Sequence, residues 1–172
     1  MEIKSPELRE LTAQIISHME ENTPRIEKCL AELTEDEVWQ RPNPASNSIG
    51  NLVLHLCGNI TQYVISSLGG RPDARDRDAE FAARNGLSKS GLMEKLRDTL
   101  HDATETIRQA GDAELMRTRT VQGFDMSGIG IIVHVCEHYS YHTGQIAFWT
   151  KLLKNKDLGF YAGLDLNVKN EG

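Results

Sequence analysis

The sequence has no uninterrupted apolar stretch of the length that a membrane-spanning helix requires. Its first ten residues, MEIKSPELRE, are polar and lead directly into an amphipathic pattern, so no secretory signal is expected. Segments of low complexity and internal repeats are also absent. Together these absences predict a cytoplasmic protein that does not insert into a membrane.

Cysteine is scarce, and acidic residues outnumber basic ones. The 3 cysteines, Cys29, Cys57 and Cys136, show no paired spacing of the kind that disulfide frameworks or zinc fingers have. We expect them to be reduced and mostly buried, which fits a cytoplasmic protein. The formal net charge is -6, and phosphate binding needs a basic face, so a nucleic-acid partner is not expected.

What the chain does contain is helical periodicity, over a length sufficient for a single domain with a hydrophobic core (1–172). Four segments place apolar residues at the i, i+3, i+4 spacing of an amphipathic helix, at about 6–33, 48–68, 88–110 and 127–153. Pro24 is expected to kink or restart the first of them. The tail from about 155 is expected to be partly irregular, with Phe160 and Tyr161 packing onto the bundle.

The connections between these segments suggest the topology. Residues 34–37 form a capping-box pattern that opens a short turn, and 112–126 look irregular, with a short extended piece around MRTRTVQGF. Because no other strand pattern is convincing, the chain is predicted to be an all-α four-helix bundle. The 69–87 connection is longer than a hairpin needs, so it can cross the bundle and make the second and third helices parallel.

Three histidines recur at intervals of four in HVCEHYSYHTGQIAFW, namely His134, His138 and His142. Neighbours in this series share one face of a helix, but the direction drifts by about 40° per step and eight residues rise about 12 Å. Zinc-type metals hold imidazole nitrogens at about 2.0–2.1 Å, so the outer two histidines cannot share one ion. At most one adjacent pair chelates, and a third ligand must come from elsewhere.

His55 is the candidate for that ligand, because it interrupts the apolar run LVLHLCGN in the second helix. Asn51, His55, Asn59 and Gln62 are spaced three or four apart and form one polar stripe. Such a stripe indicates either an internal site or a hydrogen-bonded core histidine. Three neutral nitrogens would leave positions open for water or substrate, which is typical of catalytic metal sites.

The direction of the facing helices bears on which pair joins His55. Suppose that the second and last helices are antiparallel and that the end of the second is level with the start of the last. His55 is then level with about position 140 of the last helix. That position lies between His138 and His142. A parallel arrangement would instead place His55 level with His134.

The segments SNSIGNLVLHLCGN and HVCEHYSYHTGQI resemble the DinB/YfiT-like superfamily, whose members are four-helix bundles with a divalent metal on three histidines. One histidine comes from the second helix and two come from an H-x-x-x-H-x-G-Q segment in the fourth. Matched by position, the resemblance implies the ligands His55, His138 and His142. It covers essentially the whole chain in helix order, although Thr143 stands where an arginine is common. It also implies an up-down-down-up bundle, often dimeric, that binds nickel or zinc.

The resemblance further implies a chemistry. Superfamily members with assigned functions are thiol-dependent transferases or isomerases, which use bacillithiol, mycothiol or glutathione. We therefore expect a metal-dependent transferase that activates a low-molecular-weight thiol for attack on an electrophilic small molecule. The alternatives are a metal-dependent hydrolase that uses metal-bound water and a non-enzymatic, metal-binding dimer.

Three polar residues are candidates for supporting the ligands. His134 is expected to be a hydrogen-bonded residue one turn below the site. Asn59 and Gln145 are expected to orient the ligands or a bound water through hydrogen bonds. No side chain is identified from the sequence as a nucleophile or as a general base.

The thiols in question carry carboxylates, so a basic group near the site is expected. Arg41, Arg75 and Arg77 are the candidates, and the alternative for the two on the 69–87 connection is a solvated loop balanced by acidic neighbours. Cys57 and Cys136 are not expected to act as nucleophiles. Each lies two positions from a ligand and so projects about 160° away from it on the helix.

Overall fold

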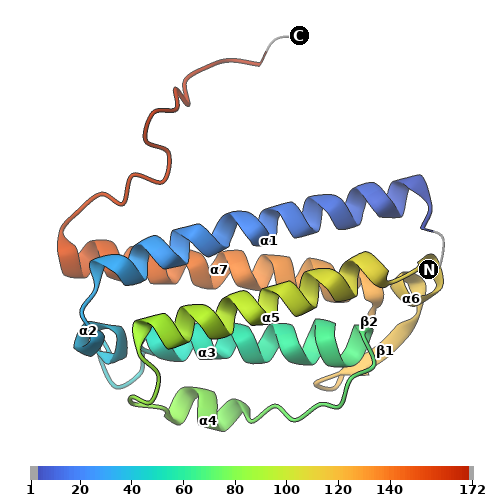
Figure 1. Cartoon of the computed structure of the whole chain (residues 1–172), viewed down its shortest axis with the longest axis horizontal. Helices are drawn as coiled ribbons and strands as arrows, with labels where there is room; N and C mark the ends of the chain where they lie inside the picture. The colour runs from blue at the N-terminus through green and yellow to red at the C-terminus, as the bar shows by residue number, and fades with distance from the viewer. Residues whose placement is uncertain (1–3, 171–172) are drawn as a thin grey trace.

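The computed structural model describes residues 4–170 as a bundle of four long helices with short elements at its ends (Figure 1). The long elements are α1 (Pro6–Glu32), α3 (Ile49–Ile60) with its π-helical continuation η1 (Thr61–Leu68), α5 (Lys89–Gln109) and α7 (Gly128–Lys154). The short elements are α2 (Glu35–Trp39), α4 (Arg77–Ala82), α6 (Asp112–Met116), β1 (Thr118–Val121) and β2 (Phe124–Ser127). The predicted four-helix bundle is confirmed, with one small hairpin added.

The helices run up, down, down and up (Figure 1). Lys4 Nζ at the start of α1 donates to the carbonyl of Ile107 at the end of α5 at 2.9 Å, as antiparallel packing of these helices requires. α1 and α7 run in one direction, whereas α3 and α5 run in the other. The 69–87 connection passes back along the outside of α3, and this crossover makes α3 and α5 parallel, as predicted.

The first helix continues through Pro24, so the predicted restart there is wrong. Proline lacks the N–H that would bond to the carbonyl one turn back, and this normally interrupts a helix. Here Met19 and Ile26, on either side of Pro24, are both 0% exposed. Burial of this apolar face on both sides of the proline stabilises one continuous helix of 27 residues.

Capping boxes begin two of the helices. Thr34 accepts from Glu37 N at 3.2 Å while the Glu37 carboxylate accepts from Thr34 N at 2.7 Å, as the sequence predicted for α2. Ser48 and Asn51 make the same reciprocal pair at the start of α3. Asn51 therefore belongs to the polar stripe and also begins the helix that carries His55.

The second long helix changes its backbone hydrogen-bonding pattern in its C-terminal part. Its last eight residues, Thr61–Leu68, form a π-helix rather than the α-helix that the periodicity predicted. π-helical turns often occur at functional sites. In this one, Gln62 and Tyr63 extend the polar stripe toward the 69–87 connection and α7.

The segment 112–126 is more regular than expected. The predicted extended piece is β1, but α6 and β2 were not predicted. β1 and β2 pair antiparallel around Gln122 and Gly123, whose φ angles of 51° and 83° form a two-residue hairpin turn. The buried Val121 fixes the hairpin against the bundle.

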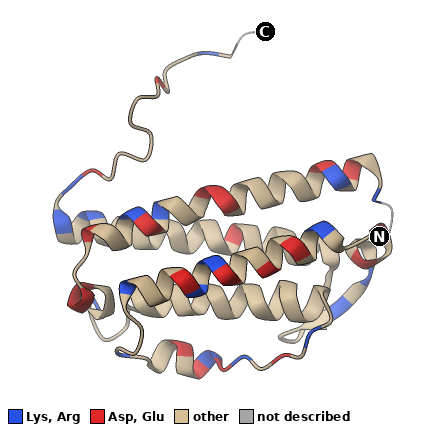
Figure 2. Ribbon diagram, viewed as in Figure 1, with Lys and Arg blue, Asp and Glu red and all other residues tan. Residues whose placement is uncertain are grey.

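Charge is distributed unevenly over the helices (Figure 2). α3 and η1 contain no Lys, Arg, Asp or Glu, whereas charged residues occur along the length of α1 and α5. The charges near the middle of α3 come instead from the connection that covers it. Within residues 4–170, no helix is both long and apolar enough to cross a membrane.

The chain after α7 packs on the bundle only at its start. Leu158 is 2% exposed and Phe160 packs against the core, as expected for the latter. Tyr161 is exposed, so its predicted packing is wrong, although the Arg25 guanidinium lies 5.6 Å from its ring. Residues 164–170 extend away from the bundle (Figure 1).

Candidate metal centre

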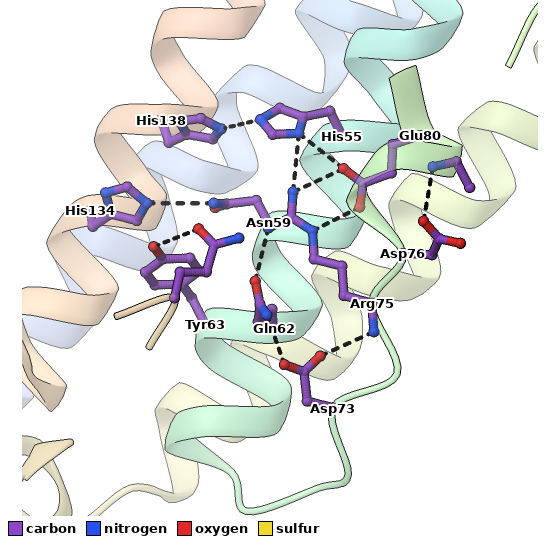
Figure 3. Close-up of polar contacts among 12 residues, drawn as sticks. His55, Asn59, Gln62, Tyr63, Asp73, Arg75, Asp76, Glu80, His134 and His138 are labelled. Carbon is purple, nitrogen blue, oxygen red and sulfur yellow. Dashed lines mark hydrogen bonds and ion pairs between the residues drawn. The ribbon is translucent and has the colours of Figure 1, made fainter. Parts of the chain in front are cut away.

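Three histidines converge between α3 and α7, at the middle of the bundle. One ring nitrogen of each of His55, His138 and His142 lies within 4.8 Å of the others. His138 Nε2 is 2.9 Å from His55 Nε2 (Figure 3). Two nitrogens that bind one tetrahedral or octahedral ion at about 2.0–2.1 Å lie about 2.9–3.4 Å apart. The cluster is therefore close to a metal-binding geometry.

The antiparallel packing of α3 and α7 selects the pair on α7. The ring of His55 is 5.0 Å from the ring of His138 and 5.1 Å from that of His142. His134 lies outside the cluster, stacked on His138 with ring centroids 5.5 Å apart. Its Nε2 is 3.4 Å from Asn59 Nδ2, so it lies one turn from the cluster, where the sequence placed it.

His142 provides a direct test of whether a metal fits. Its Nδ1 is 2.7 Å from Gln145 Oε1, and a carboxamide oxygen can only accept, so the ring proton is on Nδ1. The other nitrogen, Nε2, then has a free lone pair. This atom is buried and has no hydrogen-bond partner among the described residues. Buried polar atoms rarely lack partners, and a metal ion would supply one here.

Burial in the cluster favours the neutral form of His138 and His142. Burial, together with the charges that His142 and His55 would carry, lowers the pKa of His138 from 6.5 to about 3. Burial likewise lowers the pKa values of His142 and His134. Metals bind the neutral form of imidazole. His138 and His142 are therefore in the metal-binding protonation state at neutral pH.

A buried ion pair from the 69–87 connection lies against His55 (Figure 3). Arg75 and Glu80 form a bidentate pair with distances of 2.7 and 2.9 Å, and their side chains are 2% and 9% exposed. Glu80 Oε2 is 3.0 Å from His55 Nδ1. Burial alone would raise the pKa of Glu80, but hydrogen bonds from Arg75 and His55 outweigh it and lower that pKa.

The three candidate arginines differ in whether their guanidinium groups already bond to other residues of the protein. Arg75 is bound to Glu80 and also to Gln62 Oε1 at 3.0 Å, so the solvated-loop alternative is wrong for this residue. Arg41 donates to Asn51 Oδ1 at 3.0 Å and to the carbonyl of Phe81. The exposed Arg77 lies over the Phe81 ring at 4.8 Å, and that ring is 4.6 Å from His55.

Sequence reasoning missed Glu80. The connection offers four carboxylates, Asp73, Asp76, Asp78 and Glu80, and no spacing rule selects the one that reaches helix α3. The available signal was chemical, because a metal-binding histidine usually donates its second N–H to a carboxylate or a carbonyl. Glu137, the only acid beside the motif on α7, projects outward and is exposed.

The cysteines are not part of the cluster. All three are free, and burial raises the pKa values of Cys29 and Cys57 to about 11. Cys57 lies against Thr99 and Lys95 of α5. Burial also raises the pKa of Cys136. None of these thiols has the lowered pKa of a nucleophilic cysteine.

The bundle topology and the histidine cluster define the chain as a DinB-like helical bundle with a cluster that could hold a metal ion. The model of a family described as proteins of unknown function (DUF1572) matches residues 8–162, and the chain belongs to this family. Among curated proteins, the sequence comparison finds no match.

Solved structures share the fold at low sequence identity. A conserved protein of Enterococcus faecalis is similar with a TM-score of 0.72 and 17% identity, over 84% of this chain and 98% of that one. A DinB-like protein of Bacillus subtilis gives a TM-score of 0.65 at 17% identity, over 86% and 97%. A DinB-like protein of Bacillus cereus gives 0.65 at 17%, over 81% and 90%.

Proposed function

We propose that His55, His138 and His142 bind one divalent metal ion and that the chain is a metal-dependent enzyme. The observation that carries the proposal is the buried, unpartnered Nε2 of His142 beside two further imidazoles. Imidazole ligands suit zinc and nickel, which are the ions we expect. A site with three protein ligands keeps positions open for a substrate or a water molecule.

We further propose that the reaction is the transfer of a low-molecular-weight thiol to an electrophilic small molecule. When bound, the ion would favour deprotonation of a thiol or a water placed beside it. The protein's own thiols have raised pKa values and two of them are fully buried, so the nucleophile has to enter from solution. Small thiols stay reduced in the cytoplasm, and we propose that compartment for the protein.

Two features next to the cluster support binding of such molecules. The exposed Arg77 stacks on Phe81, which contacts His55, and its guanidinium suits a thiol carboxylate. A cavity of about 450 Å³ lies between α3 and α7 and is lined by Gln145, Trp149 and Leu52 among other residues. Because Gln145 also bonds to His142, the cavity lies next to the hydrogen-bond partner of a proposed ligand and can hold the apolar part of the electrophile.

Titration of cobalt-substituted protein with a thiol tests this function. Glutathione, bacillithiol or mycothiol is expected to change the visible spectrum, because thiolate coordination alters the ligand field and adds a sulfur-to-cobalt charge-transfer band. The His138→Ala protein is the control and should show no such change. If the wild-type spectrum responds to no thiol but the protein hydrolyses esters or amides, the hydrolase alternative replaces the transferase.

We also propose that the protein is a homodimer formed through α7. Tyr141, Phe148 and Leu152 are spaced seven and four apart and form a stripe on one face of this helix. They are 61%, 69% and 61% exposed. The same stripe on a second copy is self-complementary about a two-fold axis, as the interface of a symmetric dimer requires. Large exposed apolar side chains that lie together usually mark such interfaces.

Light scattering after size exclusion tests the dimer. The wild type is expected at twice the 19.3 kDa mass of the chain, and Phe148→Asp is expected at the monomer mass because it buries a charge in the interface. Phe124→Asp is the matched control, since Phe124 is 64% exposed on the hairpin and should leave the dimer intact. A monomeric wild type would contradict this assignment.

A further inference from the structure

Nδ1 of His55, the ring nitrogen that faces away from His138, lies close to one hydrogen-bond acceptor and one hydrogen-bond donor. Glu80 Oε2, which can only accept, lies 3.0 Å from His55 Nδ1. Arg75 Nη2, which can only donate, lies 3.1 Å from the same atom. The inner nitrogen, Nε2, faces His138, so it is the atom that a metal would bind. A ring proton on Nδ1 leaves Nε2 free for the metal, whereas a proton on Nε2 blocks it.

Glu80 is held in place by a network that extends along the covering connection. Its two oxygens are bound by Arg75 Nε and Nη2, and Arg75 Nη1 donates to Gln62 on η1. Asp73 completes the network by accepting from Gln62 Nε2 at 2.7 Å and from Arg75 N at 3.1 Å (Figure 3). Nearly every polar atom of the Arg75–Glu80 pair is thus used in aiming one carboxylate oxygen at His55.

The helix beneath this pair leaves room for it. A Cβ at Gly58 would lie 1.8 Å from Glu80 Oε1 and 2.9 Å from Arg75 Nε. Glycine is unfavourable inside a helix, but here its missing side chain is the space that the ion pair occupies. Asn51, two turns earlier, holds the end of α4 by donating to the carbonyls of Glu80 and Ala83 at 2.9 and 2.8 Å.

We propose that Glu80 is a positioning residue for the metal centre, which fixes the ring proton of His55 on Nδ1 and presents the Nε2 lone pair to the ion. This inference rests on the proposed metal-binding function. The carboxylate accepts the Nδ1–H and also offsets the charge of Arg75. Without it, Arg75 would be the neighbour of Nδ1, would draw the ring proton to Nε2 and would leave a cation beside the ion.

Metal affinity in variants that keep all three histidines tests the inference. Glu80→Gln removes the charge but keeps the shape, and Gly58→Ala displaces the intact carboxylate. Each is expected to weaken zinc binding about 10–100-fold, as measured by competition with a chelating dye. Gly91→Ala is the matched control, because a Cβ there meets no atom closer than 3.5 Å and should leave the affinity unchanged.

The ¹⁵N spectrum of the His55 ring in metal-free protein supplies a second readout that needs no activity. The wild type is expected to show the Nδ1–H tautomer, and Glu80→Gln to move the ring toward the Nε2–H form. Circular dichroism identifies any variant that fails to fold. If Glu80→Gln does not fold, Gly58→Ala, which keeps both charges of the ion pair, tests the inference in its place. The inference is overturned if folded variants bind zinc within roughly twofold of the wild type and the His55 tautomer is unchanged.

This design separates two failures. If the wild type itself binds no divalent ion, the proposed function fails, whereas the tautomer of His55 still reports whether Glu80 fixes it. If the wild type binds zinc and the Glu80 and Gly58 variants bind it equally well, only the positioning role fails.

Discussion

Replacing His138 with alanine is expected to reduce the bound metal from one ion per chain to none after dialysis. The substitution leaves His55 and His142 as the only protein ligands, and it removes the nitrogen that lies 2.9 Å from His55 Nε2. Two imidazoles on separate helices hold an ion far more weakly than three. His55→Ala and His142→Ala are expected to behave in the same way, and any thiol-transfer activity should be lost in all three. Elemental analysis of the dialysed proteins measures the effect.

His134→Ala is the matched control for these variants. His134 lies on the same helix at the same four-residue spacing, but its ring stacks on His138 and its Nε2 faces Asn59 rather than the cluster. We expect this variant to retain one ion per chain. Equal metal loss from His134→Ala and His138→Ala would show that His138 and His142 are not the pair on α7 that binds the ion.

Arg75→Met is expected to lower the free energy of unfolding of the metal-free protein by about 3–5 kcal/mol, because it leaves the Glu80 carboxylate buried without its cation. The Arg75 side chain is 2% exposed, so little water would reach the carboxylate to compensate. Urea denaturation in the presence of EDTA measures the change. The double variant Arg75→Met/Glu80→Leu should recover most of the loss, since replacement of both charges removes the unpaired ion.

Arg71→Met provides the comparison on the same connection. Arg71 and Asp102 form an ion pair whose side chains are 58% and 45% exposed. Its loss should lower the free energy of unfolding by no more than about 1 kcal/mol. An Arg75→Met effect as small as that of Arg71→Met would mean that the connection is not anchored by the buried pair.

The bundle was predictable from helical periodicity, and the histidine cluster from periodicity together with the resemblance of its two segments to the DinB/YfiT-like superfamily. The apolar spacing located each long helix, and the rise per residue excluded a site that uses both His134 and His142. Packing of the long helices then brought His55 to the level expected from antiparallel register. Spacing and rise per residue are local rules that need no tertiary contact, whereas the register argument also needed the antiparallel topology.

The features that the sequence did not reveal depend on tertiary contacts. Glu80 reaches His55 only because the crossover lies along α3 and Gly58 leaves room for it. The continuity of α1 through Pro24 reflects burial on both sides of the proline rather than local propensity. The hairpin turn uses Gln122 at a positive φ, a conformation that its residue type does not favour.

The metal content of wild-type protein purified without a histidine tag is the most direct test of the metal centre. We expect about one equivalent of zinc or nickel per chain, lost on treatment with a chelator and restored when either ion is added back. A folded protein that retains no divalent metal and takes up none from an excess of zinc or nickel would contradict it.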